Sequence, residues 1–492
     1  MKRFCDLLDG LEVKEIIGDC DVEVSSLAYD SRKVKDGGVF IAIKGTITDG
    51  HKFIKSAIQL GAKAVVCEKN LVKEKERNGV VIVVVENTRK ALANISKNWY
   101  GNPSENMSLI GVTGTNGKTT VSFLLRDILS GFGKNVGLIG TTGIFINDMK
   151  LPATHTTPES LELFEYLTEM KDRGIDTVVM EVSSHSLVQQ RVSCLDFNYA
   201  VFTNLSHDHL DYHKTIEDYA KAKKILFDGL GESSSVFYNG DDQWGNYVVS
   251  ECKAKKYSIG RNNGNDIKIY NERMSFDGNN FLLRINERLS IELKTPLLGR
   301  FNVENVAFAV SVAVCLGYDL ERISDIVSKV NGASGRMQKI RLANGSVGIV
   351  DYAHTPDALE KVLQTCRGLI ESDNSGGRLI CVFGCGGNRD KAKRPKMGRI
   401  ASELADLVVI TDDNPRDEDP LSIINDIYSG VKRSNRKKVE LISNRADAIN
   451  FAVKNSKSND IILVAGKGHE SYQIYGSERR HFDDYEQLQL YV

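Results

Sequence analysis

The amino-acid sequence predicts an α/β protein built from three domains. A chain of 492 residues is too long for one hydrophobic core, because domains usually hold about 100 to 200 residues. From residue 108 to about 230, apolar strand-like runs alternate with helical patterns, which is typical of βαβ units around a mostly parallel sheet. We expect a small N-terminal domain over residues 1–104, a central domain over 105–333 and a C-terminal domain over 334–492.

The N-terminal domain is predicted from three short apolar runs, at 39–43, 64–67 and 80–85, which mix with helical patterns as in a small α/β unit. The stretch that follows, residues 99–108, concentrates Gly, Asn, Pro and Ser between periodic segments. We therefore expect this stretch to be a linker into the central domain.

A β-rich excursion interrupts the central domain over residues 265–294. Alternating hydrophobicity and the turn sequence at 277–280 predict antiparallel hairpins there, and a helix is expected near 303–316. The C-terminal domain begins near Gly335 and is expected to be Rossmann-like. Its buried strands are predicted at 348–350, 379–383, 407–410 and 461–464.

Composition excludes several classes of protein. Lys and Arg total 64 and Asp and Glu total 65, so no overall field attracts nucleic acid or an anionic membrane. No apolar run reaches the ~18 residues of a spanning helix, and the first residues lack the apolar stretch of a signal peptide. Nine scattered cysteines form no C-x-x-C pair, and we interpret Cys381 and Cys385 as packing residues. We expect a soluble, cytoplasmic, monomeric protein that binds small molecules.

The stretch GVTGTNGKTT at residues 111–120 predicts a phosphate-binding turn. It follows an apolar run and precedes a helical pattern, so backbone N–H groups and a helix N-terminus would face an anion. Lys118 would reach the terminal phosphates and Thr119 would contact Mg²⁺. Val112 stands where the usual loop has its first glycine, but two later glycines supply the permissive backbone. The alternative is a tight glycine turn with an exposed lysine.

Glu181 ends the apolar strand of the stretch DTVVMEVSSHSLVQQR. A carboxylate at a neighbouring strand tip is suited to hold the Mg²⁺ of a phosphate loop, although such a residue is more often at the surface. Three lysines farther along, Lys221, Lys223 and Lys224, are interpreted from their pattern as one charged helix face.

His207, His209 and His213 lie close together in the stretch NLSHDHLDYH. Their density suggests zinc, but no cysteine accompanies them and no H-E-x-x-H sequence is present. The alternative is a set of structural or solvated loop histidines.

Polar residues also follow the predicted C-terminal strands. The run Gly384–Gly387 resembles a dinucleotide fingerprint only superficially, because Arg389 stands at the third glycine position. Arg389, Arg416 and Glu470 each follow a predicted strand, so two cations and one anion are expected to converge at one sheet edge. Such a set suits an amino acid zwitterion.

Taken together, these motifs identify the chain as a member of the Mur ligase family. The resemblance runs in order over nearly the whole chain and includes YDSRKVKDGGVFIAIKG, TGTNGKTT, HTTPES, MEVSSHSLVQQRV, FTNLSHDHLDYH, AKKILF, LLGRFNVENV, SGRMQ, DYAHTPDALE, DNPR and GKGHESYQ. The phosphate loop of this family has the shorter glycine pattern found here. The resemblance implies an ATP-dependent, amide-forming ligase of peptidoglycan precursor synthesis, on the branch that adds meso-2,6-diaminopimelate to UDP-N-acetylmuramoyl-L-alanyl-D-glutamate.

The resemblance also implies the roles of individual residues. The ATP positions are Gly114, Thr115, Asn116, Gly117, Lys118, Thr119, Thr120, Asn302, Arg336 and Asp351, with His354 as a further candidate. The positions for Mg²⁺, expected as two ions, are Thr119, Glu181, His209 and Lys223, the last as an N-carboxylysine formed with CO₂. The catalytic positions are Lys118, Lys223, His209 and Glu181. The match thus replaces the charged-face interpretation for Lys223 but not for Lys221 or Lys224.

Two substrate sites follow in the same way. The UDP-linked dipeptide positions are Ser31, Thr156, Thr157, Ser183, Gln189 and Arg191. The diaminopimelate positions are Arg389, Asp413, Asn414, Pro415, Arg416, Gly466 and Glu470. The alternative for Arg416 is that it merely pairs with Asp417, Glu418 or Asp419 on a solvated turn.

Three rival functions remain open. The first is a ligase that carries out the same reaction with lysine as acceptor, and such an enzyme would be expected to lack the arginine of DNPR. A folylpolyglutamate synthetase shares the ATP loop but is disfavoured by the N-terminal DSR stretch and by DNPR. A P-loop regulatory or motor ATPase would need no second substrate site, so the charged cluster of the C-terminal domain counts against it.

Overall fold

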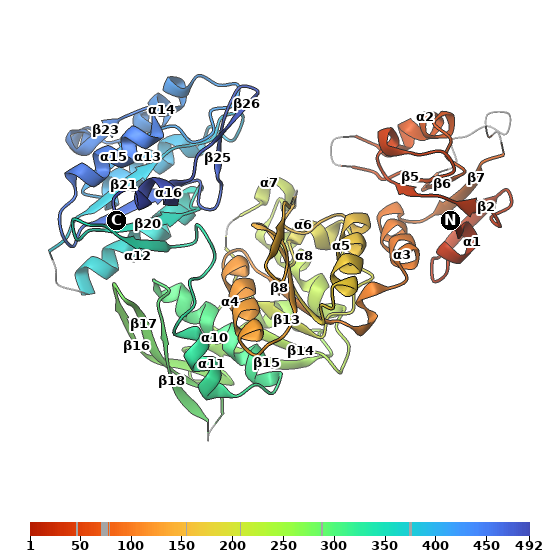
Figure 1. Cartoon of the computed structure of the whole chain (residues 1–492), viewed down its shortest axis with the longest axis horizontal. Coiled ribbons are helices and arrows are strands. Elements are labelled where there is room, and N and C mark those ends of the chain that lie inside the picture. The colour runs from red at the N-terminus through yellow and green to blue at the C-terminus, as the bar shows by residue number, and fades with distance from the viewer. Residues whose placement is uncertain are drawn as a thin grey trace. The chain divides into compact units, whose positions relative to one another are not determined.

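The computed structural model describes residues 1–45, 48–69, 77, 79–153, 155–206, 208–286, 289–372 and 376–492. It confirms the predicted α/β architecture with three successive α/β parts (Figure 1). By internal contacts the chain divides into two compact units, Met1–Asp266 with Ser311–Ala313 and Ile267–Val310 with Val314–Val492. The N-terminal sheet and the central parallel strands belong to the first unit.

A five-stranded sheet forms the N-terminal part, and only its edge strand β2 runs antiparallel to its neighbour. Its three central strands consist of buried apolar residues, which confirms the three runs expected there. The order is β2 (Val13–Ile17), β7 (Val81–Val85), β6 (Ala64–Cys67), β5 (Val39–Ile41) and β4 (Leu27–Ala28). The other elements are β1 (Lys2–Arg3), paired with β3 (Glu23–Val24), and α1 (Phe4–Leu7), α2 (Ile54–Gln59) and α3 (Thr88–Tyr100).

The predicted linker at 99–108 is wrong at both ends. Helix α3 continues through Tyr100, because Trp99 packs against the N-terminal core and Gly101 takes the left-handed conformation that caps a helix C-terminus. Pro103–Asn106 form a short 3₁₀ helix, and β8 (Ser108–Thr113) starts directly afterwards. Helix α3 lies against α5 (Ser160–Asp172) of the central part.

The central sheet is mostly parallel, as the alternating pattern predicts. Its strands in the first unit follow the order β11 (Met149–Leu151), β10 (Gly143–Ile146), β9 (Val136–Gly140), β12 (Thr177–Glu181), β8, β13 (Tyr199–Phe202), β14 (Ser235–Asn239) and β15 (Lys255–Gly260). The helices are α4 (Lys118–Gly131), α5, α6 (Ser184–Val188), α7 (Leu210–His213), α8 (Ile216–Asp228) and α9 (Gly245–Val248). Glu181 of β12 is in register with Val112 of β8, and Phe202 of β13 with Thr113, so these three strands end at one edge.

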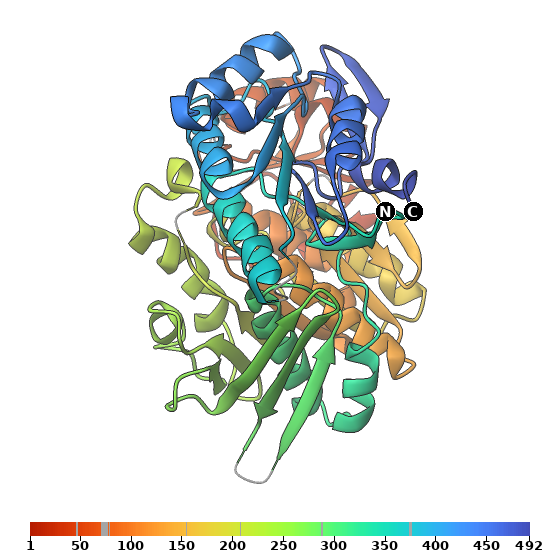
Figure 2. The same cartoon turned by 90° about the vertical axis from the view of Figure 1, so that its left-hand side faces the viewer.

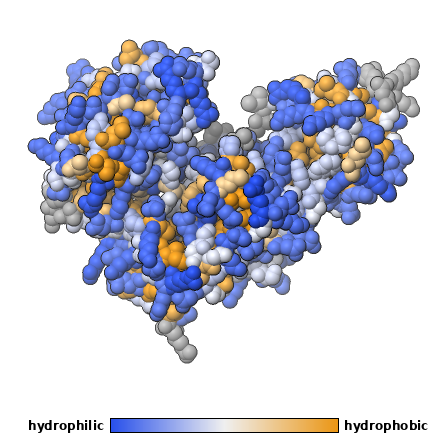
Figure 3. All heavy atoms as spheres, viewed as in Figure 1, coloured by the Kyte–Doolittle hydropathy of each residue, from blue (hydrophilic) through white to orange (hydrophobic). Residues whose placement is uncertain are grey.

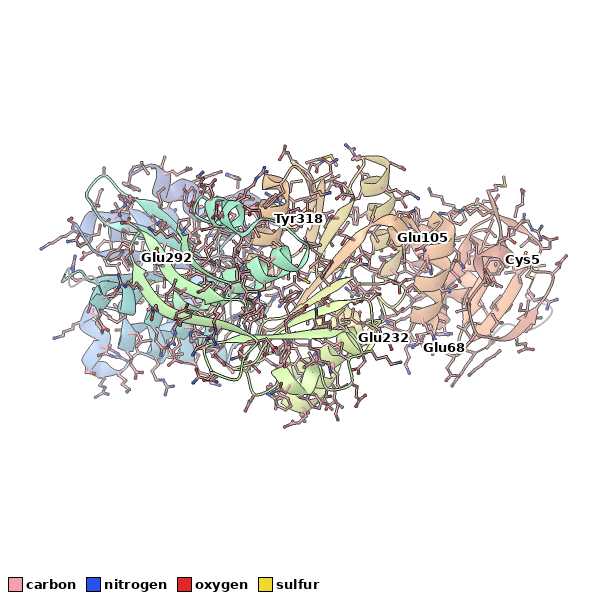
Figure 4. All side chains as sticks on the ribbon, turned by 90° about the horizontal axis from the view of Figure 1, so that it is seen from below. Cys5, Glu68, Glu105, Glu232, Glu292 and Tyr318 are labelled. Atoms are coloured by element: carbon pink, nitrogen blue, oxygen red, sulfur yellow. The ribbon has the colours of Figure 1, made fainter. Side chains whose placement is uncertain are left out.

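The β-rich excursion forms two antiparallel hairpins, as the sequence predicts (Figure 2). The turn expected at 277–280 lies instead at 276–277, because residues 278–280 pair within the sheet. Strand β16 (Ile267–Ser275) turns at residues 276–277 into β17 (Gly278–Arg284), which pairs with β18 (Ser290–Thr295). Helix α10 (Arg300–Cys315) begins three residues before its predicted start, and α11 (Leu320–Val327) packs on β18. Glu292 of β18, labelled in Figure 4, accepts a hydrogen bond at its carbonyl from Ser324 at 3.5 Å.

A six-stranded sheet forms the C-terminal part, and only β19 is antiparallel to its neighbour. All four buried strands expected here are confirmed, and Cys381 and Cys385 are buried, as expected of packing residues. The order is β19 (Gln338–Arg341), β20 (Val347–Asp351), β24 (Ile461–Ala465), β21 (Leu379–Phe383), β22 (Leu407–Ile410) and β23 (Val439–Leu441). The remaining elements are α12 (Pro356–Ser372), α13 (Lys393–Leu404), α14 (Pro420–Ser429), α15 (Arg445–Asn455), α16 (Asp484–Gln489) and the hairpin β25 (Tyr472–Tyr475) with β26 (Glu478–His481).

The face of the molecule seen in Figure 3 is mainly hydrophilic, with hydrophobic side chains in small groups. Among the described helices, none combines the length and the apolar character that crossing a lipid bilayer requires.

Candidate active site

The turn between β8 and α4 is held from outside by the residues that follow β13. Thr203 donates its hydroxyl to the carbonyl of Asn116 at 2.6 Å, and Asn204 accepts the N–H of Thr115 at 2.8 Å. Gly114 has φ +150°, and a Cβ there would stand 1.9 Å from the Thr203 hydroxyl oxygen, so only glycine fits. Helix α4 begins directly at Lys118. The turn therefore has the fixed, glycine-dependent geometry of an anion cradle at a helix N-terminus.

Two lysines converge on this turn. Lys118 Nζ donates to the carbonyls of Gly114 and Thr115 at 2.8 and 2.9 Å. Lys223 Nζ, from α8, donates to the same Gly114 carbonyl at 2.9 Å and lies 4.6 Å from the centre of the Tyr219 ring. The Lys223 side chain is only 1% exposed, and burial, together with the nearby Lys118 charge, lowers the pKa of its ammonium well below the ordinary value.

Glu181 is fully buried at the end of β12, so the interpretation as a surface residue is wrong. Its carboxylate accepts hydrogen bonds from the Thr119 hydroxyl at 3.0 Å, and from the N–H and hydroxyl of Thr141 at 3.0 and 3.1 Å. A Cβ on Gly140 would stand 2.3 Å from this carboxylate. A threonine hydroxyl and a carboxylate side by side are the oxygen ligands that Mg²⁺ prefers.

The histidines of the stretch after β13 lie in an aromatic cluster. The ring of His209 lies 5.0 Å from that of His185 and 6.0 Å from that of Tyr219. His213 is buried, stacks on Tyr219 and shares a 2.8 Å hydrogen bond with the Ser184 hydroxyl. His207 lies outside the described residues. Within the part of the chain that the structure describes, no group of three or more His, Cys, Asp or Glu is arranged to hold a metal.

The other two lysines of α8 differ from each other. Lys221 is exposed and pairs with Asp218 at 3.4 Å, as expected of a charged helix face. Lys224 is only 7% exposed and pairs with Asp228 at 2.6 Å and Glu251 at 3.3 Å. The charged-face interpretation is therefore wrong for Lys224, because packing of α8 against α9 covers its stem.

A third group lies beside Glu181. The Thr157 hydroxyl donates to the Glu181 carbonyl at 2.8 Å and accepts the N–H of Ser183 at 3.1 Å. Arg191 donates to the Thr157 carbonyl and to the Gln189 side chain, both at 2.7 Å. Burial lowers the pKa of Arg191 from its ordinary value, and this pKa shift is opposed by nearby carboxylate charge.

Two further contacts belong to this group. The Thr156 hydroxyl lies 3.0 Å from that of Thr141, and Glu159 pairs with Arg191 at 2.9 Å. Thr141, Thr203 and Glu159 were not predicted as individual site residues, although Thr203 lies within FTNLSHDHLDYH and Glu159 within HTTPES. Ser31 begins a 3₁₀ helix after β4, and no hydrogen bond in the described part of the chain joins it to this group.

We predict that Gly114→Ala weakens ATP binding by about 100-fold, because the new methyl group must displace Thr203 and reshape the turn. Titration calorimetry with a non-hydrolysable ATP analogue measures this. Gly231→Ala is the matched control, since no atom lies within 4 Å of the added Cβ. Unchanged affinity in folded Gly114→Ala would contradict the cradle geometry.

In the second unit, three expected ATP positions gather around Tyr352. The Arg336 guanidinium lies 4.9 Å from its ring centre, and His354 Nδ1 lies 2.9 Å from its carbonyl. Buried Asp351 accepts the N–H groups of Met337 and Ala353 at 2.8 and 2.9 Å, and burial raises the pKa of its carboxyl.

Asn302 lies apart from these residues in α10. It is buried, and its amide donates to the Leu298 carbonyl at 2.8 Å.

The residues after β22 and β24 meet at one edge of the C-terminal sheet. The Asn414 amide donates to Asp413 at 3.0 Å and to Glu470 at 2.9 Å. Gly466 has φ +115°, and a Cβ there would stand 2.8 Å from the Asp413 carboxylate. Burial, reinforced by Asp413, raises the pKa of Glu470. Lys467, which sequence analysis missed, is fully buried and lies 3.5 Å from Glu470.

Arg416 and Arg389 converge at the neighbouring loop. A Cβ on Gly386 would stand 2.9 Å from Arg416 Nη1 and 3.6 Å from Arg389 Cγ. Arg416 Nη1 donates to the carbonyl of Gly387 at 2.9 Å, and Pro415 before it is buried.

The three acids that follow Arg416 have other partners. Asp417 accepts from the Asn388 amide, Glu418 pairs with Arg394, and Asp419 caps α14. Within the described ranges Arg416 makes no ion pair, so the alternative that it pairs with one of these acids is wrong.

Three family models match the chain and together cover more than half of it. They are the Mur ligase middle domain over residues 112–313, the Mur ligase glutamate ligase domain over 335–468 and the Mur ligase family catalytic domain over 23–100. The order of the three matches follows the order of the three sheets.

Full-length relatives give the same result. The UDP-N-acetylmuramoyl-L-alanyl-D-glutamate–2,6-diaminopimelate ligase of Clostridium tetani (strain Massachusetts / E88) is 43% identical over 98% of this chain and 97% of its own. A solved structure of a ligase of that name is 34% identical, with a TM-score of 0.71 over 100% of this chain and 98% of its own. The MurF ligase of Thermotoga maritima in complex with ADP shares the fold, with a TM-score of 0.60 at 19% identity over 89% of this chain and 93% of its own. The chain belongs to the Mur ligase family.

Proposed function

We propose that this protein is an ATP-dependent ligase that joins meso-2,6-diaminopimelate to the D-glutamate carboxylate of UDP-N-acetylmuramoyl-L-alanyl-D-glutamate. The observation that carries the proposal is the likeness to ligases of this name along the whole chain. It is supported by a phosphate turn and a separate charged edge in one chain, since a simple ATPase needs no second substrate site. Because the reaction consumes ATP in building a cell-wall precursor, we infer that it takes place in the cytoplasm.

Each domain has its own substrate in this proposal. Residues 1–104 bind the UDP part, residues 105–333 bind ATP, and residues 334–492 bind the incoming amino acid. The hydrogen-bonded group around Thr157 and Arg191 supports a role in holding the sugar and peptide of the UDP substrate. The ATP positions are those of residues 114–120, with Asn302, Arg336, Asp351 and His354.

The reaction has two steps. A carboxylate oxygen of the UDP-linked dipeptide attacks the γ-phosphorus of ATP, the bond to ADP breaks, and an acyl phosphate forms. The amine of diaminopimelate then attacks the acyl carbon, loses a proton and expels inorganic phosphate, which leaves an amide. Two anions meet in the first step, so Lys118 stabilises the charge that shifts onto the phosphate oxygens. The acyl phosphate must be kept from water until the amine arrives.

We propose that Thr119, Glu181, His209 and Lys223 hold Mg²⁺. The contact of 3.0 Å between the Thr119 hydroxyl and the buried Glu181 carboxylate supports the fit. An ammonium cannot ligate a cation, whereas a carbamate on Lys223 would add two anionic oxygen ligands. When bound, Mg²⁺ neutralises part of the triphosphate charge.

The test of the proposed reaction is phosphate release and product mass in parallel. A ligase releases phosphate only when the UDP-linked dipeptide and the amino acid are both present. Diaminopimelate, lysine and ornithine are compared as acceptors at equal concentration. Phosphate release with neither substrate would indicate an ATPase, and equal use of lysine and diaminopimelate would contradict the proposed acceptor.

Arg416 is expected to choose the acceptor. Diaminopimelate carries a second carboxylate, with which a guanidinium can form a bidentate, hydrogen-bonded ion pair, and lysine has no carboxylate at that position. Leaving such a partner unpaired costs about 2 to 5 kcal/mol, so wild-type protein should prefer diaminopimelate by roughly 30-fold to several thousand-fold. Arg416→Ala should raise the KM for diaminopimelate steeply with the KM for ATP nearly unchanged, and Arg416→Lys should recover only part of the loss.

Steady-state kinetics with each substrate varied in turn measures these constants. Arg433→Ala, at an exposed arginine of the same domain, is the control and should leave both KM values unchanged. An equal rise of the ATP and diaminopimelate KM values in Arg416→Ala would contradict the assignment.

A further inference from the structure

An ion pair joins buried Arg394 to Glu418 of the loop that carries Arg416; the Glu418 side chain is 17% exposed and also lies 3.1 Å from Lys391. Arg394 of α13 has a fully buried side chain and meets Glu418 with both terminal nitrogens, Nη1 to Oε2 at 2.9 Å and Nη2 to Oε1 at 3.0 Å. Such a parallel pair of hydrogen bonds fixes the carboxylate in direction as well as in distance. Glu418 stands two residues after Arg416, so fixing it restrains that loop.

The same pair also holds the loop that carries Arg389. Glu418 Oε1 also accepts a hydrogen bond from the N–H of Asn388 at 2.6 Å, and Arg394 Nη2 donates to the Gly386 carbonyl at 3.3 Å. Arg389 follows Asn388 directly in the sequence. One ion pair therefore restrains two loops that are far apart in the sequence.

The two loops are joined above the pair as well. Gly387 donates its N–H to the Asn414 carbonyl at 2.9 Å, and the Asn388 amide donates to Asp417 at 2.8 Å. Asn388 and Arg416 have φ angles of +54° and +53°. Asparagine adopts this left-handed backbone readily, whereas arginine seldom does, so the loop of Arg416 in particular depends on these contacts.

We propose that Arg394 and Glu418 are positioning residues that set the spacing of Arg389 and Arg416, and so set the preference for an acceptor with a second carboxylate. The inference rests on the proposed function. The Arg416 guanidinium and the stem of the Arg389 side chain both lie close to Gly386, so the two loops carry neighbouring cationic side chains that repel each other. The Arg394–Glu418 ion pair opposes separation of these loops. A site whose charged groups are already in place loses less conformational entropy on binding than a site that must first order its loops.

The structure supplies a matched control at the same guanidinium. Asp426 of α14 accepts from Arg394 Nη1 at 2.9 Å, the same distance as Glu418 Oε2. Its side chain is 43% exposed, and the described part of the chain shows no contact from its carboxylate to either arginine-bearing loop. Loss of Asp426 thus tests whether the ion pair acts through the loops or only through helix packing.

The experiment compares Glu418→Gln with Asp426→Asn in the full-length protein. We expect Glu418→Gln to raise the KM for diaminopimelate by about 10- to 100-fold and to narrow the preference over lysine, since small misplacement of binding groups has effects of this size. In this variant the KM values for ATP and the UDP-linked dipeptide should change less than about 2-fold. In Asp426→Asn the KM values for diaminopimelate, ATP and the UDP-linked dipeptide should all change less than about 2-fold. A shared rise in all KM values, or an equal effect of Asp426→Asn, would overturn the inference.

A second measurement combines Glu418→Gln with Arg416→Lys. If Glu418 acts by placing Arg416, its loss costs little once Arg416 is altered, so the two effects on KM are not additive. Additive effects would overturn the inference, and thermal unfolding shows that each variant is folded. Wild-type preference for diaminopimelate is measured first. Its absence contradicts the proposed acceptor, whereas an intact preference with an unchanged KM in Glu418→Gln contradicts this inference alone.

Discussion

Lys118→Ala is expected to lower the ligation rate by at least about 1000-fold without unfolding the protein. Lys118 lies at the first position of α4 and donates to the carbonyls of Gly114 and Thr115 in the turn. The turn itself is held by Thr203 and Asn204, so its backbone should persist when the ammonium is removed. The variant loses stabilisation of the charge that develops during phosphoryl transfer. Removing a single hydrogen-bond donor from such a site lowers the reaction rate by about 100- to 1000-fold, and removing a lysine that contacts the phosphates is expected to lower it further.

The rate is measured as ADP and amide product formed with saturating UDP-linked dipeptide and diaminopimelate. Lys221→Ala is the control, because Lys221 is an exposed lysine of the same domain that pairs with Asp218 on the helix surface. Its rate should equal that of the wild-type protein. A wild-type rate in Lys118→Ala would contradict the assignment of the phosphate turn, while a lowered unfolding temperature would show that the lysine has a structural role instead.

Lys223→Ala is expected to be nearly inactive, also by about 1000-fold, and to be partly rescued by short carboxylates such as formate or acetate. Carbamate formation joins an uncharged amine to the carbon of CO₂ and releases one proton, so it needs an amine that is not held as ammonium. Lys223 meets this requirement, since its side chain is buried against the Tyr219 ring and burial lowers the pKa of its ammonium. The resulting anion would supply oxygen ligands of the kind that suits Mg²⁺.

Rescue is measured as the ligation rate at increasing formate concentration. Lys224→Gln is the control, because Lys224 lies next in the same helix but forms ion pairs with Asp228 and Glu251. It should keep the wild-type rate. Activity of Lys223→Ala without added carboxylate would contradict a role for the carbamate, and so would wild-type activity that does not fall when CO₂ and bicarbonate are removed.

Much of the fold follows from local sequence. The strands β6, β21 and β22 lie at the predicted residues, since continuous apolar runs bounded by turn residues specify strands buried on both faces. The linker prediction failed at Trp99 and Tyr100, because contacts with the N-terminal core extend α3 past the point where local composition suggests a turn. Packing overrode propensity there.

The candidate site divides in the same way. The phosphate turn was predictable because its function lies in a short stretch of backbone, in which Gly114, Gly117 and Lys118 are neighbours. The diaminopimelate edge was predictable only as a set of polar residues after strands. Their mutual distances come from a parallel sheet whose strands are separated by whole helices in the sequence.

The sequence by itself determined the family, the class of reaction and the order of the three domains, because each is encoded in contiguous motifs whose residues act together. Only the tertiary structure decided that Lys223 is buried while Lys221 is exposed, since residues two apart on a helix point to different faces and packing determines which face is covered. It also decided the partners of the three acids that follow Arg416, which are Asn388, Arg394 and the N-terminus of α14. Ion pairs join whichever charges the fold brings within about 4 Å, and that distance is set by packing between remote segments, not by neighbours along the chain.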